Sequence, residues 1–198
     1  SVETQGIVVF RKKVKEAYES GAFTDLQVCR LLKFLHLSFF KNVEGTLADA
    51  YIGCFDEVGE CPEEAYRCLQ AKATSKKETN GYKFGQVKHG KYVNCLIFCV
   101  ALDIEKIWWF KYDSLDLPKD HGTLNISRSR DVDRNILDFT SEESILRFAV
   151  AFFDLPLLTE LEARTPIAKT HKKEHLGIMQ YLKFHNMKQG QDYTYPKD

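Results

Sequence analysis

The sequence predicts an α+β or α/β fold in which a central mixed sheet of four or more strands is flanked by helices. Three observations support this prediction. Helical periodicity occupies residues 1–43, short apolar segments separated by turn signals follow over 44–139, and helical periodicity returns over 140–198, ahead of a polar tail. Helices before and after a run of closely spaced strands are typical of one sheet covered by helices. We therefore expect a single domain over residues 1–198.

Two helices are expected in the first of these regions. Between residues 6 and 40, apolar side chains recur every three or four positions, and Ser20-Gly21 interrupts the pattern. Thr24 and Asp25 are alternative N-caps for the second helix, because either side chain can accept a hydrogen bond from the first helical turn.

The central region begins with two strand candidates that carry polar residues. Thr46–Gly53 is short and ends at a glycine, which favours a strand over the competing helix. Tyr66–Thr74 alternates in character, so a strand there projects Gln70 and Lys72 from the same face.

Further along the chain, residues 91–102 and 106–112 are the most apolar strand candidates, and 103–105 is the expected hairpin turn between them. The flanking segments 75–90 and 118–134 are polar, and we expect exposed loops there, with strand character near 124–127.

A helix is then expected from an N-cap at Ser141 through Phe153. A last helix is expected to begin near Pro166.

Composition limits the classes of partner. The 28 Lys and Arg residues balance 28 Asp and Glu residues, so affinity for nucleic acid would have to come from local clusters of cations. The longest apolar run, residues 95–102, is too short to cross a bilayer, so no membrane partner is expected. Six cysteines without a signal-like start or a Cys-x-x-Cys pair favour a reducing, intracellular location, cytoplasmic or nuclear. Cys95 and Cys99 are expected in the core.

Three residues carry the strongest chemical signal. Asp49 is followed, after 20 intervening residues, by Gln70-Ala71-Lys72. Phosphodiester hydrolysis needs a divalent cation held by oxygen ligands and a group that orients or activates water. Asp49 and Gln70 supply such oxygens, and Lys72 supplies a positive charge two residues along the same strand face.

Over about residues 44–112 this pattern resembles the PD-(D/E)xK nuclease superfamily, in a Gln-x-Lys variant. The resemblance implies a restriction-endonuclease-like fold and a Mg²⁺-dependent DNA endonuclease, with Mn²⁺ as an expected substitute. Asp49 and Gln70 would hold the ion, and Lys72 would assist the attacking water. Glutamine in place of the usual acid leaves one fewer negative charge and favours a single ion.

Further acidic candidates accompany this signature. The resemblance makes Glu44 a second catalytic acid, brought from a preceding element. Asp56 and Glu57 compete with Asp49 as the acidic ligand, ranked below it.

Clustered cations are the candidate substrate contacts. Such side chains can hold the phosphates that flank a scissile bond, although a solvated polar loop explains them nearly as well. The residues are Lys76, Lys77, Lys88, His89, Arg128 and Arg130. A homodimer is expected if both strands of a duplex are cut. Trp108 and Trp109 are expected to pack in the sheet rather than to stack on bases.

Two alternatives of other classes remain open. The first is a non-catalytic nucleic-acid-binding or protein-interaction domain with a degenerate nuclease fold. The glutamine at position 70, in place of the usual acid, supports this alternative. The second is a zinc protease, because residues 171–175 read His-Lys-Lys-Glu-His. A third-ligand motif is not evident, and an exposed basic helical turn explains that segment equally well.

Overall fold

The computed structural model describes residues 1–41, 48–53, 66–85, 87, 95–115, 122–127 and 131–157. The elements in this part of the chain are α1 (Val2–Ser20), α2 (Leu26–Leu37), β1 (Phe39–Lys41), β2 (Ala50–Gly53), β3 (Tyr66–Thr74), β4 (Tyr82–Gly85), β5 (Leu96–Ala101), β6 (Lys106–Lys111), η1 (Tyr112–Ser114), β7 (Thr123–Ile126), η2 (Asp133–Asn135) and α3 (Glu142–Phe153).

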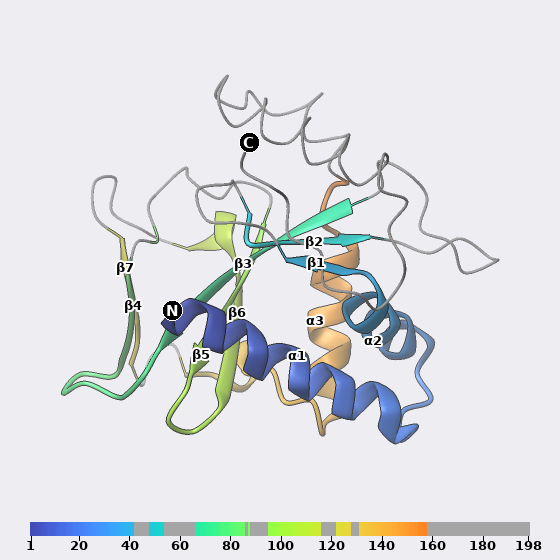
Figure 1. Cartoon of the computed structure of the whole chain (residues 1–198), viewed down its shortest axis with the longest axis horizontal. Coiled ribbons are helices and arrows are strands. Elements are labelled where there is room, and N and C mark those ends of the chain that lie inside the picture. The colour runs from blue at the N-terminus through green and yellow to red at the C-terminus, as the bar shows by residue number, and fades with distance from the viewer. Residues whose placement is uncertain are drawn as a thin grey trace.

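The strands form two sheets. The larger has the order β1-β2-β3-β5-β6, in which β3 and β5 are parallel and every other neighbouring pair is antiparallel. The smaller consists of the antiparallel pair β4 and β7, which stand side by side away from α2 and α3 (Figure 1). A mixed sheet with helices packed against it confirms the predicted α+β class.

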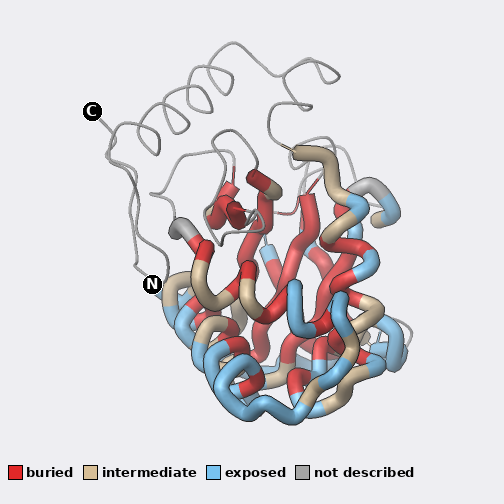
Figure 2. The backbone as a smooth tube through the Cα atoms, turned by 90° about the vertical axis from the view of Figure 1, so that its right-hand side faces the viewer, coloured by how far each residue is buried: buried red, intermediate tan, exposed pale blue. Residues whose placement is uncertain are grey.

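Each face of the large sheet has its own apolar core. Leu69, Ala71 and Phe98 face α1, α2 and α3. Cys68 and Cys99 face the other way, into a core that the β4–β7 pair completes with Phe84 and Ile126 among others. Figure 2 shows buried positions along the strands and exposed ones on the outer turns. Strand alternation therefore sends successive side chains into two separate cores.

The N-terminal helices begin where capping chemistry allows. The Ser1 hydroxyl caps α1 by accepting from the Thr4 N–H. The Asp25 carboxylate, rather than Thr24, caps α2 by accepting from the N–H groups of Gln27 and Val28. Helix α1 then buries Ile7, Phe10, Val14 and Ala17, an i, i+3, i+7, i+10 stripe that packs on the sheet.

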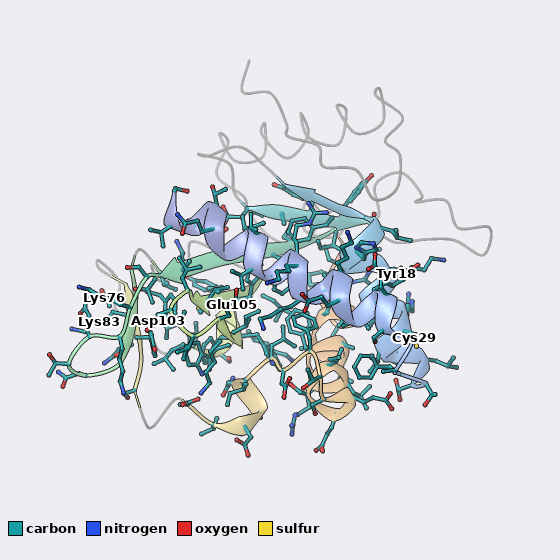
Figure 3. The ribbon with its side chains drawn as sticks, turned by 60° about the horizontal axis from the view of Figure 1, so that its bottom comes forward. Tyr18, Cys29, Lys76, Lys83, Asp103 and Glu105 are labelled. Atoms are coloured by element: carbon teal, nitrogen blue, oxygen red, sulfur yellow. The ribbon has the colours of Figure 1, made fainter. Side chains whose placement is uncertain are left out.

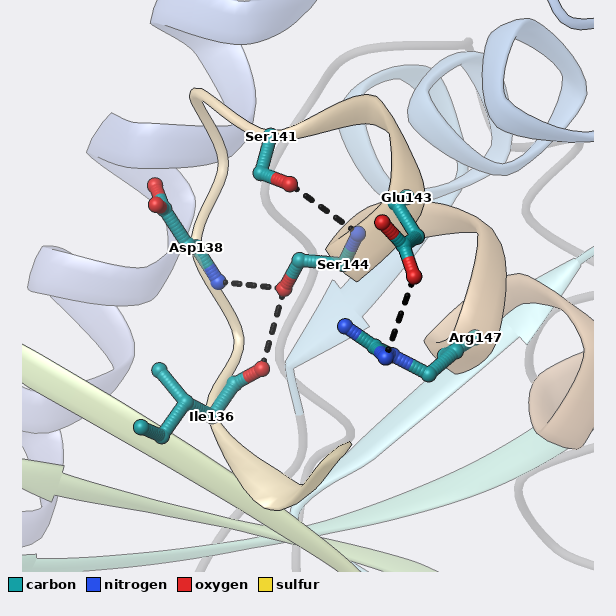
Figure 4. A network of polar contacts seen from close by, with 6 residues as sticks. All are labelled: Ile136, Asp138, Ser141, Glu143, Ser144 and Arg147. Carbon is teal, nitrogen blue, oxygen red and sulfur yellow. Dashed lines mark hydrogen bonds and ion pairs between the residues drawn. The ribbon is translucent and has the colours of Figure 1, made fainter. Parts of the chain in front are cut away.

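The start of α3 is tied to the sheet edge by a polar network (Figure 4). The expected N-cap is confirmed, because the Ser141 hydroxyl accepts from the Ser144 N–H. The Ser144 hydroxyl donates to the Ile136 carbonyl and accepts from the Asp138 N–H, both at 2.9 Å. Leu137 donates its N–H to the Ile107 carbonyl at 2.8 Å, so the same short segment covers part of the edge of β6.

Several elements differ from the sequence-based expectation. The second helix ends at Leu37, and Phe39–Lys41 pairs with β2 instead of continuing the helix to residue 40. The segment 75–90, expected to be an exposed loop, contributes β4, whose Phe84 is buried, and the strand character expected near 124–127 is confirmed by β7, which pairs with β4. Each of these strands is stabilised by a partner distant in sequence, which local patterns do not reveal.

Other expectations are confirmed or lie elsewhere. Cys95 and Cys99 are buried in the core, and Trp108 and Trp109 pack in the sheet. Among the described helices none has the length and apolar character needed to span a bilayer. The helix expected near Pro166 and the histidines of 171–175 lie outside the described residues.

Gly6 sets how closely α1 approaches β3. A Cβ atom placed on Gly6 would lie 2.7 Å from the Cβ of Ala73, an atom fixed to the β3 backbone. We expect Gly6→Ala to lower the free energy of unfolding, because the overpacking cost of about 1–3 kcal/mol exceeds the roughly 1 kcal/mol gained in helix propensity. Denaturant titration measures this effect.

Gly85→Ala is the matched control, since nothing lies within 4 Å of its added methyl group. Equal stability of Gly6→Ala and the wild type would show that the helix and strand can separate without cost.

Candidate active site

The candidate site forms where β3 extends beyond its last pair with β2. Strand β2 begins at Ala50, which pairs with Leu69, whereas β3 continues to Thr74 and remains paired with β5 on its other side. Among the described strands, none pairs with β3 on the β2 side beyond this point. The N–H groups that point along the sheet toward that side therefore need other acceptors.

Asp49 supplies one such acceptor. Its Oδ2 atom accepts a hydrogen bond of 2.8 Å from the N–H of Ala71. Ala71 lies between Gln70 and Lys72, and the charge of Lys72 acts on the Asp49 carboxyl. The structure thus brings together two of the residues that the sequence predicted, and a carboxylate takes the place of the next residue of β2.

A second carboxyl group, Glu3, comes to the same point from the first turn of α1. Its side chain is hydrogen-bonded to that of Asp49. Sequence reasoning missed Glu3 because it started the first helix at Gly6. A signal was present, since Glu3 precedes Ile7, Phe10 and Val14 by four, seven and eleven residues and so falls on the buried stripe of α1.

The surroundings of Asp49 strongly alter its protonation. Burial raises its pKa, and the hydrogen bond and charge of Glu3 raise it further. The Ala71 N–H and the Lys72 ammonium oppose these effects, and the resulting pKa is about 8. Asp49 therefore holds a proton at neutral pH, and a cation that binds there must displace it.

Gln70 and Lys72 are less accessible than an open sheet edge would make them. Leu69 and Ala71 face the helices, so alternation places Gln70 and Lys72 on the opposite face with Cys68. Their exposed fractions are only 5% and 7%. Both side chains are buried because β3 is a central strand and the second core covers that face.

The Gln70 side chain carries an unpaired polar atom. Its Oε1 is buried and has no hydrogen-bond donor. An acceptor held away from water in this way costs about 1–3 kcal/mol unless a donor or a cation meets it. The amide oxygen is therefore available as a ligand, which is the role the sequence predicted for it.

The oxygen donors at this site fit a hard divalent cation. Within the described residues no three His, Cys, Asp or Glu side chains group as metal ligands. The candidate donors are instead mixed: the carboxyl groups of Asp49 and Glu3, which are hydrogen-bonded to each other, and the amide oxygen of Gln70, which projects from the face of β3 that points away from the helices. Carboxylate and amide oxygens are the ligands that Mg²⁺ accepts, and Mg²⁺ usually retains water in its remaining positions.

The remaining predicted residues divide into two groups. Lys76 and Lys77 are exposed beyond the end of β3, and Figure 3 shows Lys76 beside Lys83 and Asp103, far from Tyr18 and Cys29. At about 3.3 Å per strand residue, they lie roughly 13–17 Å along the chain from Lys72. The others, Glu44, Asp56, Glu57, Lys88, His89, Arg128 and Arg130, lie outside the described residues.

Comparison with known proteins finds no relative of this chain. The chain matches no protein-family model, no curated protein and no solved structure. Any function must therefore be argued from the site itself.

The raised pKa of Asp49 predicts a pH-dependent stability. The carboxyl is protonated in the folded state up to about pH 8 but ionises near 3.8 when unfolded. The folded state thus binds the extra proton between these values, and its stability falls as pH rises from 5 to 8, by at most about 1.4 kcal/mol per pH unit.

We expect Asp49→Asn to lack this dependence, so that its free energy of unfolding gains on the wild type as pH increases. Denaturant melts at several pH values measure the difference. Asp154→Asn, which changes an exposed carboxylate, should follow the wild type throughout. Parallel profiles for the wild type and Asp49→Asn would contradict the assignment.

Proposed function

We propose that this protein is a divalent-metal-dependent endonuclease that hydrolyses phosphodiester bonds in DNA. The observation that carries the proposal is the 2.8 Å hydrogen bond from the Ala71 N–H to Asp49. It holds the carboxyl group of Asp49, the residue before β2, at the backbone of β3 between Gln70 and Lys72. Glu3 adds a second carboxylate beside it.

The residues divide the work of the reaction between them. A bound Mg²⁺ would neutralise phosphate charge and lower the pKa of a water ligand. Asp49, Glu3 and the Gln70 amide oxygen would hold that ion. The ammonium of Lys72, only 7% exposed, lies where the dielectric is low, so its charge stabilises a nearby anion more strongly than it would in water. Water attacks phosphorus directly as the bond to the leaving oxygen breaks.

Contacts with DNA beyond the site would be electrostatic. Lys76 and Lys77 are the exposed cations that follow β3 on the chain from Lys72 and could contact phosphates away from the scissile bond. Because the net charge is zero, local cations such as these would supply the affinity. Cleavage of both strands of a duplex would need two copies of the site and hence a homodimer.

One observation favours a second candidate function, a non-catalytic nucleic-acid-binding or protein-interaction domain. Gln70 and Lys72 are nearly buried, and a scissile phosphate must reach the level of Lys72 for that residue to act on it. A domain that has lost catalysis needs no such access. Binding of metal without cleavage distinguishes this alternative.

Metal binding is expected to stabilise the folded protein. Mg²⁺ or Mn²⁺ should raise the melting temperature of the wild type, because a ligand of the folded state stabilises it by mass action. Glu3→Gln and Asp49→Asn each remove a carboxylate and should reduce the shift strongly. Lys12→Gln, an exposed change elsewhere on α1, should keep it. An equal shift in all four proteins would place the cation elsewhere.

Cleavage tests the catalytic assignment. The full chain should convert supercoiled plasmid to nicked or linear forms with Mg²⁺ or Mn²⁺ and should not do so with chelator. Asp49→Asn and Lys72→Met should lower the rate by about 10²-fold or more, whereas Lys12→Gln should not. Cleavage that survives both substitutions excludes these residues from catalysis. Metal-dependent stabilisation with no cleavage of plasmid or single-stranded DNA supports the non-catalytic domain.

A further inference from the structure

A separate groove lies beside the outer strand of the large sheet, on the face that carries the helices. It has a volume of about 830 Å³. Its walls come from the end of β6 and η1, from the segment around η2, and from α3. The lining residues are Trp109, Phe110, Lys111, Ser114, Leu115, Val132, Arg134, Asn135, Leu146, Arg147, Val150 and Ala151.

These walls are held in place by bonds already described and by one more. The Asn135 Nδ2 group donates to the Trp109 carbonyl at 3.1 Å and so fixes η2 against β6. The Ser144 network fixes the start of α3 against the segment that covers β6 (Figure 4). The groove is therefore bounded by elements that are tied to one another.

The groove exposes apolar surface to solvent. Val150 on α3 is 62% exposed and Val132 is 36% exposed, and both are among the exposed large apolar residues of the described chain. Leu146 lies one helical turn before Val150, so the two form a ridge along one wall. Trp109 packs edge-on against Phe148, with ring centroids 5.6 Å apart. These side chains would form an apolar contact surface for a ligand.

The charged residues of the groove are all cations. Lys111, Arg134 and Arg147 line it, and none of the described lining residues is acidic. Lys111 and Arg147 have partners outside the lining, but both ion pairs are long and exposed: Asp154 lies 3.9 Å from Lys111 and Glu143 lies 3.4 Å from Arg147. Pairs of this kind contribute little free energy. The groove is therefore complementary to an anion.

Two buried donors in the lining have no acceptor. They are the indole Nε1–H of Trp109, a residue only 9% exposed, and the Nε–H of Arg147. Trp108, its neighbour in sequence, shows the contrast, because its Nε1 donates to Asp131 at 3.0 Å. Unsatisfied buried donors are uncommon in native proteins and call for an acceptor oxygen.

We propose that this groove binds a small amphipathic carboxylate. The alkyl or aryl body would lie on the apolar ridge, and the carboxylate would lie beside the three cations Lys111, Arg134 and Arg147. The volume falls within the roughly 300–1,000 Å³ of small-molecule sites. The proposal is independent of the nuclease function, because none of the residues that line the groove belongs to the candidate active site.

The two tryptophans make the test direct. In the ¹⁵N-labelled full chain, the indole N–H signals of Trp108 and Trp109 can be assigned with Trp109→Phe. Titration with decanoate should shift the Trp109 signal saturably and leave that of Trp108, already bonded to Asp131, nearly unchanged. Decanol and decyltrimethylammonium should bind at least about tenfold more weakly, since they lose a charge-assisted hydrogen bond. An unmoved Trp109 signal, or equal binding of decanol, overturns the proposal.

A matched pair of variants locates the site. Val150→Glu places a carboxylate on the wall of the groove and should weaken decanoate binding at least about tenfold. Val8→Glu makes the same change at an equally exposed valine on α1, 61% against 62%, and should bind as the wild type does. Wild-type affinity in folded Val150→Glu would place decanoate elsewhere and overturn the assignment.

Discussion

The candidate site depends on the hydrogen bond by which the Asp49 carboxylate accepts the Ala71 N–H. Strand β2 ends its pairing with β3 at Ala50, and β3 runs on toward Thr74. A backbone donor left at that edge must be satisfied, and a short acidic side chain at the end of β2 satisfies it. The same requirement that completes the sheet therefore holds a carboxylate beside Gln70 and Lys72.

In this arrangement, the electrostatic environment of the Asp49 carboxyl group is unfavourable for its ionised form. Asp49 and Glu3 share a hydrogen bond in a partly buried place, and the pKa of Asp49 is raised to about 8 as a result. The Gln70 oxygen near the same strand position has no donor. A well-packed apolar site of this size would be more stable. Costs of this kind concentrate at functional sites, where a ligand relieves them.

Local patterns predicted the elements that local chemistry determines. The structure matches three of these patterns. The alternating segment Tyr66–Thr74 is β3, α1 ends at the break Ser20-Gly21, and α3 begins directly after the cap Ser141. Asp49 and Lys72, singled out by their spacing, lie on neighbouring segments, since the Asp49 carboxyl accepts from the N–H of Ala71. Strands β1 and β4 were missed because each is only three or four residues long and exists through pairing with a segment that local propensity does not identify.

Glu3 shows the same limit for the site. Its position on the buried stripe of α1 can be read from the sequence, but its approach to Asp49 depends on the contact between Gly6 and Ala73. That contact joins residues of two elements far apart in the chain. The burial of Gln70 is likewise a consequence of β4 and β7, which close the second core over the face from which it projects.

On the proposed function, the acidic residues of the site would make the binding of nucleic acid depend on the metal ion. The chain has no net charge, so a polyanion meets no general attraction, and at the site itself it meets two acids. Below about pH 8 the proton on Asp49 reduces this repulsion, but the same proton competes with a cation. Above that pH both acids repel phosphate unless a cation is bound. On the proposed function, the ion would therefore be needed for the phosphate to approach as well as for its hydrolysis, and the exposed lysines beyond β3 would add affinity only after the site had been neutralised.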